Sequence, residues 1–219
     1  MKKNNSITEL EFVLKRSGSM SGVEGETIGG FNVMTEKQKR AYYVSTILFD
    51  NVSKVLHDWV KLTDVLQMTE GQFCVRGFTA LMDAIGGAIH HIGNIHKYAR
   101  PEDVPANTMF VITTDGMENA SRRYSSEQVK KMIERQKEKY GWEFLFMGAN
   151  IDALETAARY GIDADRAVNY NADEKVTQIV YDLVAETVCN VRASRQLNVE
   201  RSKEINKYYQ QRGRGAGRN

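Results

Sequence analysis

The chain has 219 residues, of which 42% are hydrophobic and 26% charged, and its formal net charge at pH 7 is +2. These values are typical of a soluble globular protein with one or two domains and a sizeable core. No apolar run approaches the ~20 residues that cross a bilayer, and no apolar signal core follows the basic N-terminus. Two cysteines, Cys74 and Cys189, are too few for a disulfide scaffold. We therefore expect a cytoplasmic protein that makes no membrane contact.

Charge is unevenly distributed along the chain. Residues 192–219 hold eight basic and two acidic side chains and carry a net charge of +6, whereas residues 1–191 carry −4. The last residues, from Gln210 onward, are rich in Arg and Gly and almost without apolar side chains, which is typical of disorder. We therefore divide the chain into a domain over 1–191 and a basic extension over 192–219 that ends in a disordered Arg/Gly tail.

The first half of the chain predicts alternating strands and helices. The pattern indicates a strand over 7–14, a helix over 23–40, and a hairpin whose strands span 42–49 and 52–60. Residues 61–78 show no clear period apart from a short extended piece over 73–75. A helix over 80–98 follows, and its residues are apolar or small on most faces, so we expect it to be well buried.

The second half continues the alternation. The predicted elements are a strand over 107–114 that is apolar enough to be buried on both faces, a charged helix over 127–139 capped by Ser126, a strand over 142–147, a helix over 151–159 closed by Gly161, a strand over 166–170, and a last helix from about 173 to at least 190. This order predicts an α/β fold with a mostly parallel central sheet, one antiparallel edge strand and helices on both faces.

Oxygen-bearing side chains occupy three of the predicted loops at strand ends. Ser17 and Ser19 follow the first strand, Thr79 precedes the buried helix, and Asp115 follows the central strand. In open α/β sheets the functional site lies at the carboxyl ends of the strands, so we expect these residues to meet. Hydroxyl groups and a carboxylate suit a hard cation such as Mg²⁺ that keeps some of its water.

The same residues resemble the metal-ion-dependent adhesion site of von Willebrand factor A (vWA) domains. Residues 15–20 (Lys-Arg-Ser-Gly-Ser-Met) are similar to the family's Asp-x-Ser-x-Ser motif, Thr79 to its threonine, and Asp115 to its distal aspartate. The likeness covers about residues 7–190 and extends to short, single-domain cytoplasmic vWA proteins of bacteria and phages. It implies a Rossmann-like fold and Mg²⁺ held by the two serines, the threonine and water-bridged aspartates. It also implies a partner carboxylate that completes the coordination, and binding rather than catalysis.

Lys15 stands where the family has an aspartate. A protonated lysine has no acceptor for a cation, and two unit charges ~4 Å apart interact by about 4 kcal/mol at an effective dielectric near 20. Lys15 and Asp115 sum to zero charge, as two aspartates and Mg²⁺ do. We predict that the Lys15 ammonium lies in or near the metal position, bonded to Asp115 and to serine or threonine hydroxyls, and that the site holds no metal. The alternative is a Lys15 that turns outward beside weakly bound Mg²⁺.

Side chains around this site are candidates to contact a partner. The predicted rim consists of basic, aromatic and sulfur-containing residues: Arg16, Met20, Phe78, Met117, Arg122 and Arg123. Such a rim suits an acidic side chain of a protein partner, or of a second copy of the chain. We therefore predict a non-enzymatic protein–protein interaction module. The alternative is a nucleic-acid-associated protein that binds RNA or DNA through the basic tail and uses the domain as a scaffold.

Other polar residues support no competing chemistry. The serines lack a Gly-x-Ser-x-Gly setting, and the histidines lack a His-Glu-x-x-His arrangement, so we expect His90, His91 and His96 to pack or cap rather than bind zinc. Asp50 follows the second strand and is predicted to form the hairpin turn. Asp83, four residues after Thr79, is placed either to reach back toward the site or to cap a turn.

Overall fold

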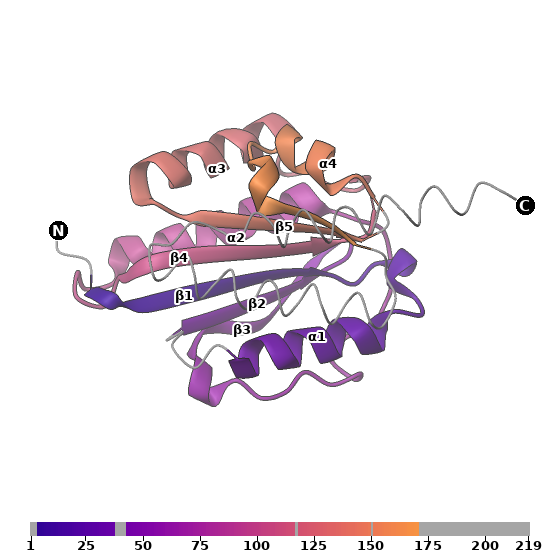
Figure 1. Ribbon diagram of the computed structural model, residues 1–219, viewed down its shortest axis with the longest axis horizontal. Coiled ribbons are helices and arrows are strands. Elements are labelled where there is room, and N and C mark those ends of the chain that lie inside the picture. Colours follow the sequence, from indigo (N-terminus) through magenta and orange to yellow (C-terminus); the bar gives the residue numbers. More distant parts are fainter. Residues whose placement is uncertain (1–3, 38–42, 117, 150, 171–219) are drawn as a thin grey trace, which may run out of the picture.

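The computed structural model describes residues 4–37, 43–116, 118–149 and 151–170, and Figure 1 shows its arrangement. Six strands form one sheet: β1 (Asn4–Lys15), β2 (Tyr43–Phe49), β3 (Ser53–Lys61), β4 (Pro105–Thr114), β5 (Glu143–Ala149) and β6 (Ala167–Tyr170). Four α-helices accompany it: α1 (Glu24–Lys37), α2 (Leu81–Tyr98), α3 (Ser126–Tyr140) and α4 (Ala153–Arg159).

The sheet has the strand order β3-β2-β1-β4-β5-β6. The β2–β3 pair is antiparallel, and every other neighbouring pair is parallel. The predicted mostly parallel sheet with an antiparallel strand at one edge is therefore confirmed. Strand β1 lies in the middle of the sheet; β2 and β3 follow on one side of it, and β4, β5 and β6 on the other. The strand order therefore reverses between the adjacent strands β1 and β4, and α/β folds place their sites at such a switch point.

Helices cover both faces of the sheet, as predicted (Figure 1). Successive residues of a strand point to opposite faces, so β1 supplies both cores. Leu10, Phe12 and Leu14 pack with α1 on one face. Val13 packs with α2 on the other face, where α3 and α4 complete the core.

The structure differs locally from the sequence prediction at the segment over 73–75 and at the start of α3. No strand forms over 73–75; Phe73 is buried beside Met68 and anchors an irregular segment to the core. The N-cap of α3 is Ser125 and not the predicted Ser126. The Ser125 side chain accepts from the Gln128 backbone N–H, and the Gln128 side chain accepts from the Ser125 backbone N–H. This reciprocal pair is a capping box.

The predictions for the C-terminal part of the chain fall outside the described residues. They are the last helix over about 173–190, the basic extension over 192–219 and the boundary drawn between 191 and 192. Within the described ranges, no helix is both long enough and apolar enough to cross a bilayer.

Helix α2 contains adjacent glycines that face different surroundings, and they give a matched test of its packing. A Cβ on Gly86 would lie 2.6 Å from the ring of Tyr124, whereas a Cβ on Gly87 would meet nothing within 4 Å. We expect Gly86→Ala to lower the free energy of unfolding by about 1–3 kcal/mol through overpacking. Gly87→Ala should raise it by about 0.5–1 kcal/mol through helix propensity. Urea unfolding measures both; equal effects would contradict the packing of Tyr124 on α2.

Candidate functional site

Three loops meet at the carboxyl edge of the sheet. They follow β1 (residues 16–23), precede α2 (residues 62–80) and follow β4 (residues 115–125). Backbone hydrogen bonds join them: the Gly18 N–H donates to the Gly77 carbonyl at 3.3 Å, and the N–H groups of Asn119 and Ala120 donate to the Thr79 carbonyl at 3.0 and 3.1 Å. Residues far apart in the sequence are thus held in one cluster.

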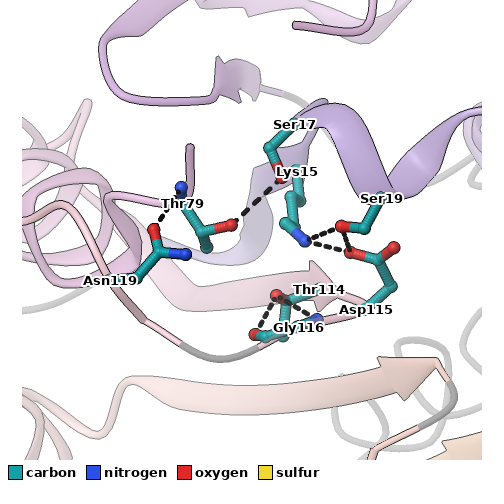
Figure 2. A network of polar contacts seen from close by, with 8 residues as sticks. All are labelled: Lys15, Ser17, Ser19, Thr79, Thr114, Asp115, Gly116 and Asn119. Carbon is teal, nitrogen blue, oxygen red and sulfur yellow. Dashed lines mark hydrogen bonds and ion pairs between the residues drawn. The ribbon is translucent and has the colours of Figure 1, made fainter. Parts of the chain in front are cut away.

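Lys15 lies inside this cluster, and its side chain is only 1% exposed. Its ammonium forms an ion pair with Asp115 and donates to the Ser19 Oγ at 2.6 Å, and Ser19 in turn donates to Asp115 at 3.0 Å (Figure 2). The Asp115 side chain is also buried. Because β1 and β4 are parallel neighbours, Lys15 at the end of β1 lies next to Asp115, which directly follows β4. The ammonium therefore points into the site.

Gly116 leaves room for the ammonium group. A Cβ at this position would lie 2.9 Å from the Lys15 Nζ, closer than real Cβ atoms approach a neighbour. The Thr114 hydroxyl donates to the Gly116 carbonyl at 3.1 Å and so fixes the turn that carries Asp115 (Figure 2). The Asp-Gly pair thus supplies both the counter-ion and the space beside it, a role for Gly116 that the sequence did not single out.

The other two predicted ligand residues form a separate pair. The Ser17 Oγ and the Thr79 Oγ1 lie 3.0 Å apart, and both residues are buried. The Thr79 backbone N–H donates to the Asn119 side chain at 2.9 Å (Figure 2). The site therefore divides into a Lys15–Ser19–Asp115 group and a Ser17–Thr79 group, and Asn119 is a supporting residue that sequence patterns did not reveal.

Two residues of the predicted rim are not on the surface. Arg16 is 2% exposed, because its guanidinium turns inward to the buried carboxylate of Asp50 at 3.1 Å, which Arg76 also approaches at 3.0 Å. Met20 is 1% exposed and packs in the core on the α1 face. Asp50 also accepts from the Val52 N–H at 2.9 Å, so it combines the predicted turn role with an ion-pair role.

The remaining rim residues lie at the surface where the structure describes them. Phe78 is 68% exposed, and Arg122 and Arg123 are exposed. Met117 lies outside the described residues. We use the term exposed rim for Phe78, Arg122 and Arg123.

Two carboxylates hold the loop after β4 on the N-terminal end of α2. Glu118 accepts from the backbone N–H of Met82 at 2.8 Å and from those of Ala120 and Ser121 at 2.8 and 2.7 Å. This role of Glu118 has no sequence signature.

Asp83 holds the next part of the same loop. It accepts from the N–H groups of Arg122, Arg123 and Tyr124 at 2.8–2.9 Å. Of the two roles left open for Asp83, the structure therefore shows the capping one, and the cap fixes the backbone of the exposed rim.

Three of the four histidines make structural contacts: His57 pairs with Thr46, His91 with Asp58 and His96 with Glu9. The fourth, His90, is exposed. Across the described ranges, no group of three or more His, Cys, Asp or Glu residues could hold a metal ion.

Comparison with solved structures shows the class of fold. The chain resembles the vWF domain of the type V pili tip protein Mfa5 from Porphyromonas gingivalis, with a TM-score of 0.65 at 10% identity over 83% of this chain and 94% of that one. A von Willebrand factor type A protein from Catenulispora acidiphila matches with a TM-score of 0.59 at 12% identity, over 84% of this chain and 42% of that one. Proximal thread matrix protein 1 from the mussel byssus matches with a TM-score of 0.58 at 13% identity, over 84% of this chain and 46% of that one.

The described domain has the vWA fold. No protein-family model and no curated protein matches the sequence. The chain spans less than half the length of the Catenulispora and mussel structures that it matches. At these identities the likeness concerns the fold, and the site must be judged from its own residues.

The vWA fold implies a divalent cation, and the residues present do not fit one. A cation site needs oxygen acceptors directed at the ion. Here a group with three donors and no acceptor, the Lys15 ammonium, points at the Ser19 and Asp115 oxygens. The polar contacts of this cluster are satisfied by the chain itself.

The Asp83 cap gives a pH-dependent prediction. Burial by itself would raise the pKa of Asp83, but the backbone N–H groups of Arg122, Tyr124 and Arg123 together outweigh it and hold the pKa below its ordinary value. Stability from this cap is therefore present above the ordinary pKa of about 3.9 and is lost as the pH falls through the lower folded value. We expect Asp83→Asn to cost about 1–3 kcal/mol at pH 7 and less at pH 3, where the loss has begun.

Denaturant unfolding at the two pH values measures this effect. The matched control is Asp163→Asn, which removes an exposed carboxylate paired with Lys137 and should cost less than about 1 kcal/mol. An Asp83→Asn penalty that does not shrink at pH 3 would contradict the assignment.

Proposed function

We propose that this vWA-fold domain is a non-enzymatic protein-interaction module that binds its partner at the exposed rim without a metal ion. The observation that carries the proposal is the buried contact of the Lys15 ammonium with Ser19 and Asp115. In the motif that residues 15–20 resemble, these positions serve a cation. Here a side-chain ammonium of this chain provides the positive charge instead.

Electrostatics support independence from metal. A divalent ion placed ~4 Å from a protonated lysine meets a repulsion of more than about 4 kcal/mol at an effective dielectric near 20. One structure of the mussel proximal thread matrix protein 1 is described as having a zinc-occupied MIDAS motif, at a TM-score of 0.52 to this chain. Metal binding thus occurs on this fold, and Lys15 is the feature of this chain that opposes it.

The exposed rim has the composition of a binding surface. Aromatic and arginine side chains dominate the energetics of protein interfaces. Phe78 is largely exposed, and the backbones of Arg122 and Arg123 are fixed by Asp83, so less ordering is needed when a partner binds. Two arginines favour a partner that presents Asp or Glu at this surface.

The groups within hydrogen-bond reach of the two serines are already committed to other contacts. A serine nucleophile requires a neighbouring base that is free to take its proton. Ser17 contacts Thr79, and Ser19 contacts Lys15 and Asp115; Asp115 is itself engaged by the ammonium. These contacts support binding rather than catalysis.

Photo-crosslinking tests the proposal. Benzoylphenylalanine replaces Phe78 on the exposed rim or, as the matched control, Val55, which is 50% exposed on the edge strand β3. In an extract of the organism that makes the protein, with EDTA present, we expect a protein adduct from position 78 and none from position 55. Reversing both rim charges, in Arg122→Glu/Arg123→Glu, should reduce the adduct about tenfold or more.

Three results would contradict the proposal. They are equal adduct yields from the two positions, an adduct that requires added Mg²⁺, and an adduct that is lost on nuclease treatment. The last result would favour the nucleic-acid alternative, in which the basic extension supplies the affinity and the salt dependence is steep.

A further inference from the structure

A concave feature lies at the opposite end of the domain from the Lys15 site. A cavity of about 590 Å³ opens between α2 and α3, beside Pro105 at the start of β4 and Trp142 just before β5. The ten residues of β4 separate it from the Lys15 site, a distance of about 30 Å at the usual rise of a strand. Its volume is within the roughly 300–1,000 Å³ of small-molecule sites.

The walls of the cavity are apolar and well fixed. Ile89, Met132 and Trp142 contribute to them. The Trp142 ring stacks on Phe110 with centroids 5.4 Å apart and meets the His96 ring edge to face at 5.4 Å. His96 is held in turn by a 2.8 Å contact with Glu9. A rigid aromatic wall of this kind suits a planar apolar ligand.

The charged groups at the cavity are all basic. Lys97 and Arg135 line it from α2 and α3, both are exposed, and His90 lies on the same side of α2. No Asp or Glu is among the described residues that line it, and no carboxylate in the described part of the chain pairs with Lys97 or Arg135. Basic side chains without counter-ions at a cavity favour an anionic ligand.

A buried amide supplies the third feature. Gln136 lines the cavity and is only 9% exposed, yet its Oε1 has no hydrogen-bond partner in the described part of the chain. Buried polar atoms are almost always paired, so Gln136 is an uncompensated polar group in the cavity wall. We propose that this cavity is a second binding site, for a small organic anion with an aromatic body.

The proposal predicts how two related dyes bind. 1-Anilinonaphthalene-8-sulfonate combines fused aromatic rings, a sulfonate and an N–H donor, whereas N-phenyl-1-naphthylamine has the same rings and N–H without the charge. With the full chain in its folded state, we expect saturable binding of the sulfonate at one site per chain, followed by dye fluorescence. The neutral dye should bind about tenfold or more weakly.

Variants localise the binding. A Cβ on Gly93 would meet the nearest atom, the Gln136 Nε2, only at 4.0 Å, so Gly93→Leu can fill the cavity without a backbone clash and should abolish binding. Arg135→Gln should weaken binding about fivefold to tenfold. The matched control Lys131→Gln removes a positive charge from the same helix outside the cavity and should leave the affinity unchanged.

Any of three results would overturn the proposal. They are the absence of saturable binding, equal affinity for the two dyes, and binding that Arg135→Gln and Lys131→Gln affect alike. If Gly93→Leu fails to fold, which far-UV circular dichroism reveals, the dye comparison and the two α3 variants still decide the question. Dye binding retained by folded Gly93→Leu would place the dye elsewhere and equally overturn it.

Discussion

The buried ion pair between Lys15 and Asp115 is the constraint around which the strand-end cluster is built. Both side chains are withdrawn from solvent, and each neutralises the other. Removal of either partner would leave an uncompensated buried charge, which costs about 3–5 kcal/mol in measured cases. The space beside Gly116 and the hydroxyl of Ser19 are arranged to suit the ammonium. The Lys15 ammonium is therefore a built-in positive group whose presence does not depend on the ionic composition of the solution.

The loops around this centre are held by side chains that bind backbone groups. Asp83 and Glu118 together accept six backbone N–H bonds. One donor, Met82, lies in the first turn of α2, where helix geometry leaves the N–H groups unpaired, and the other five lie in the loop after β4. This bracing lets the exposed rim present Phe78 and two arginines on a rigid base. The N-terminal end of α2 holds the loop that carries the two arginines, and the C-terminal half of α2 lines the cavity between α2 and α3. Helix α2 therefore contributes to both the exposed rim and the cavity.

Hydrophobic periodicity predicted the sheet well, because each strand must bury its own apolar residues. The sequence also predicted Ser17, Ser19, Thr79 and Asp115 as strand-end residues, since the loops that carry them follow from the strand order. Loop side chains were harder to predict. Arg16 and Met20 were assigned to the surface but are buried. Arg16 turns inward to Asp50, and Met20 packs in the core on the α1 face; in both cases the contacts come from distant parts of the sequence. Glu118 accepts from three backbone N–H groups and Asn119 from one, and such contacts leave no periodic pattern in the sequence.

Calorimetric titration of Mg²⁺ and Mn²⁺ into the protein and into Lys15→Asp tests the central claim most directly. The variant restores the aspartate of the motif that residues 15–20 resemble, and Lys15→Met is the matched control that removes the charge without adding a ligand. We predict no binding heat for the unmodified chain or for Lys15→Met, and saturable binding for Lys15→Asp. Mg²⁺ binding by the unmodified chain as tight as that of Lys15→Asp would contradict the claim that the Lys15 ammonium takes the place of a metal ion.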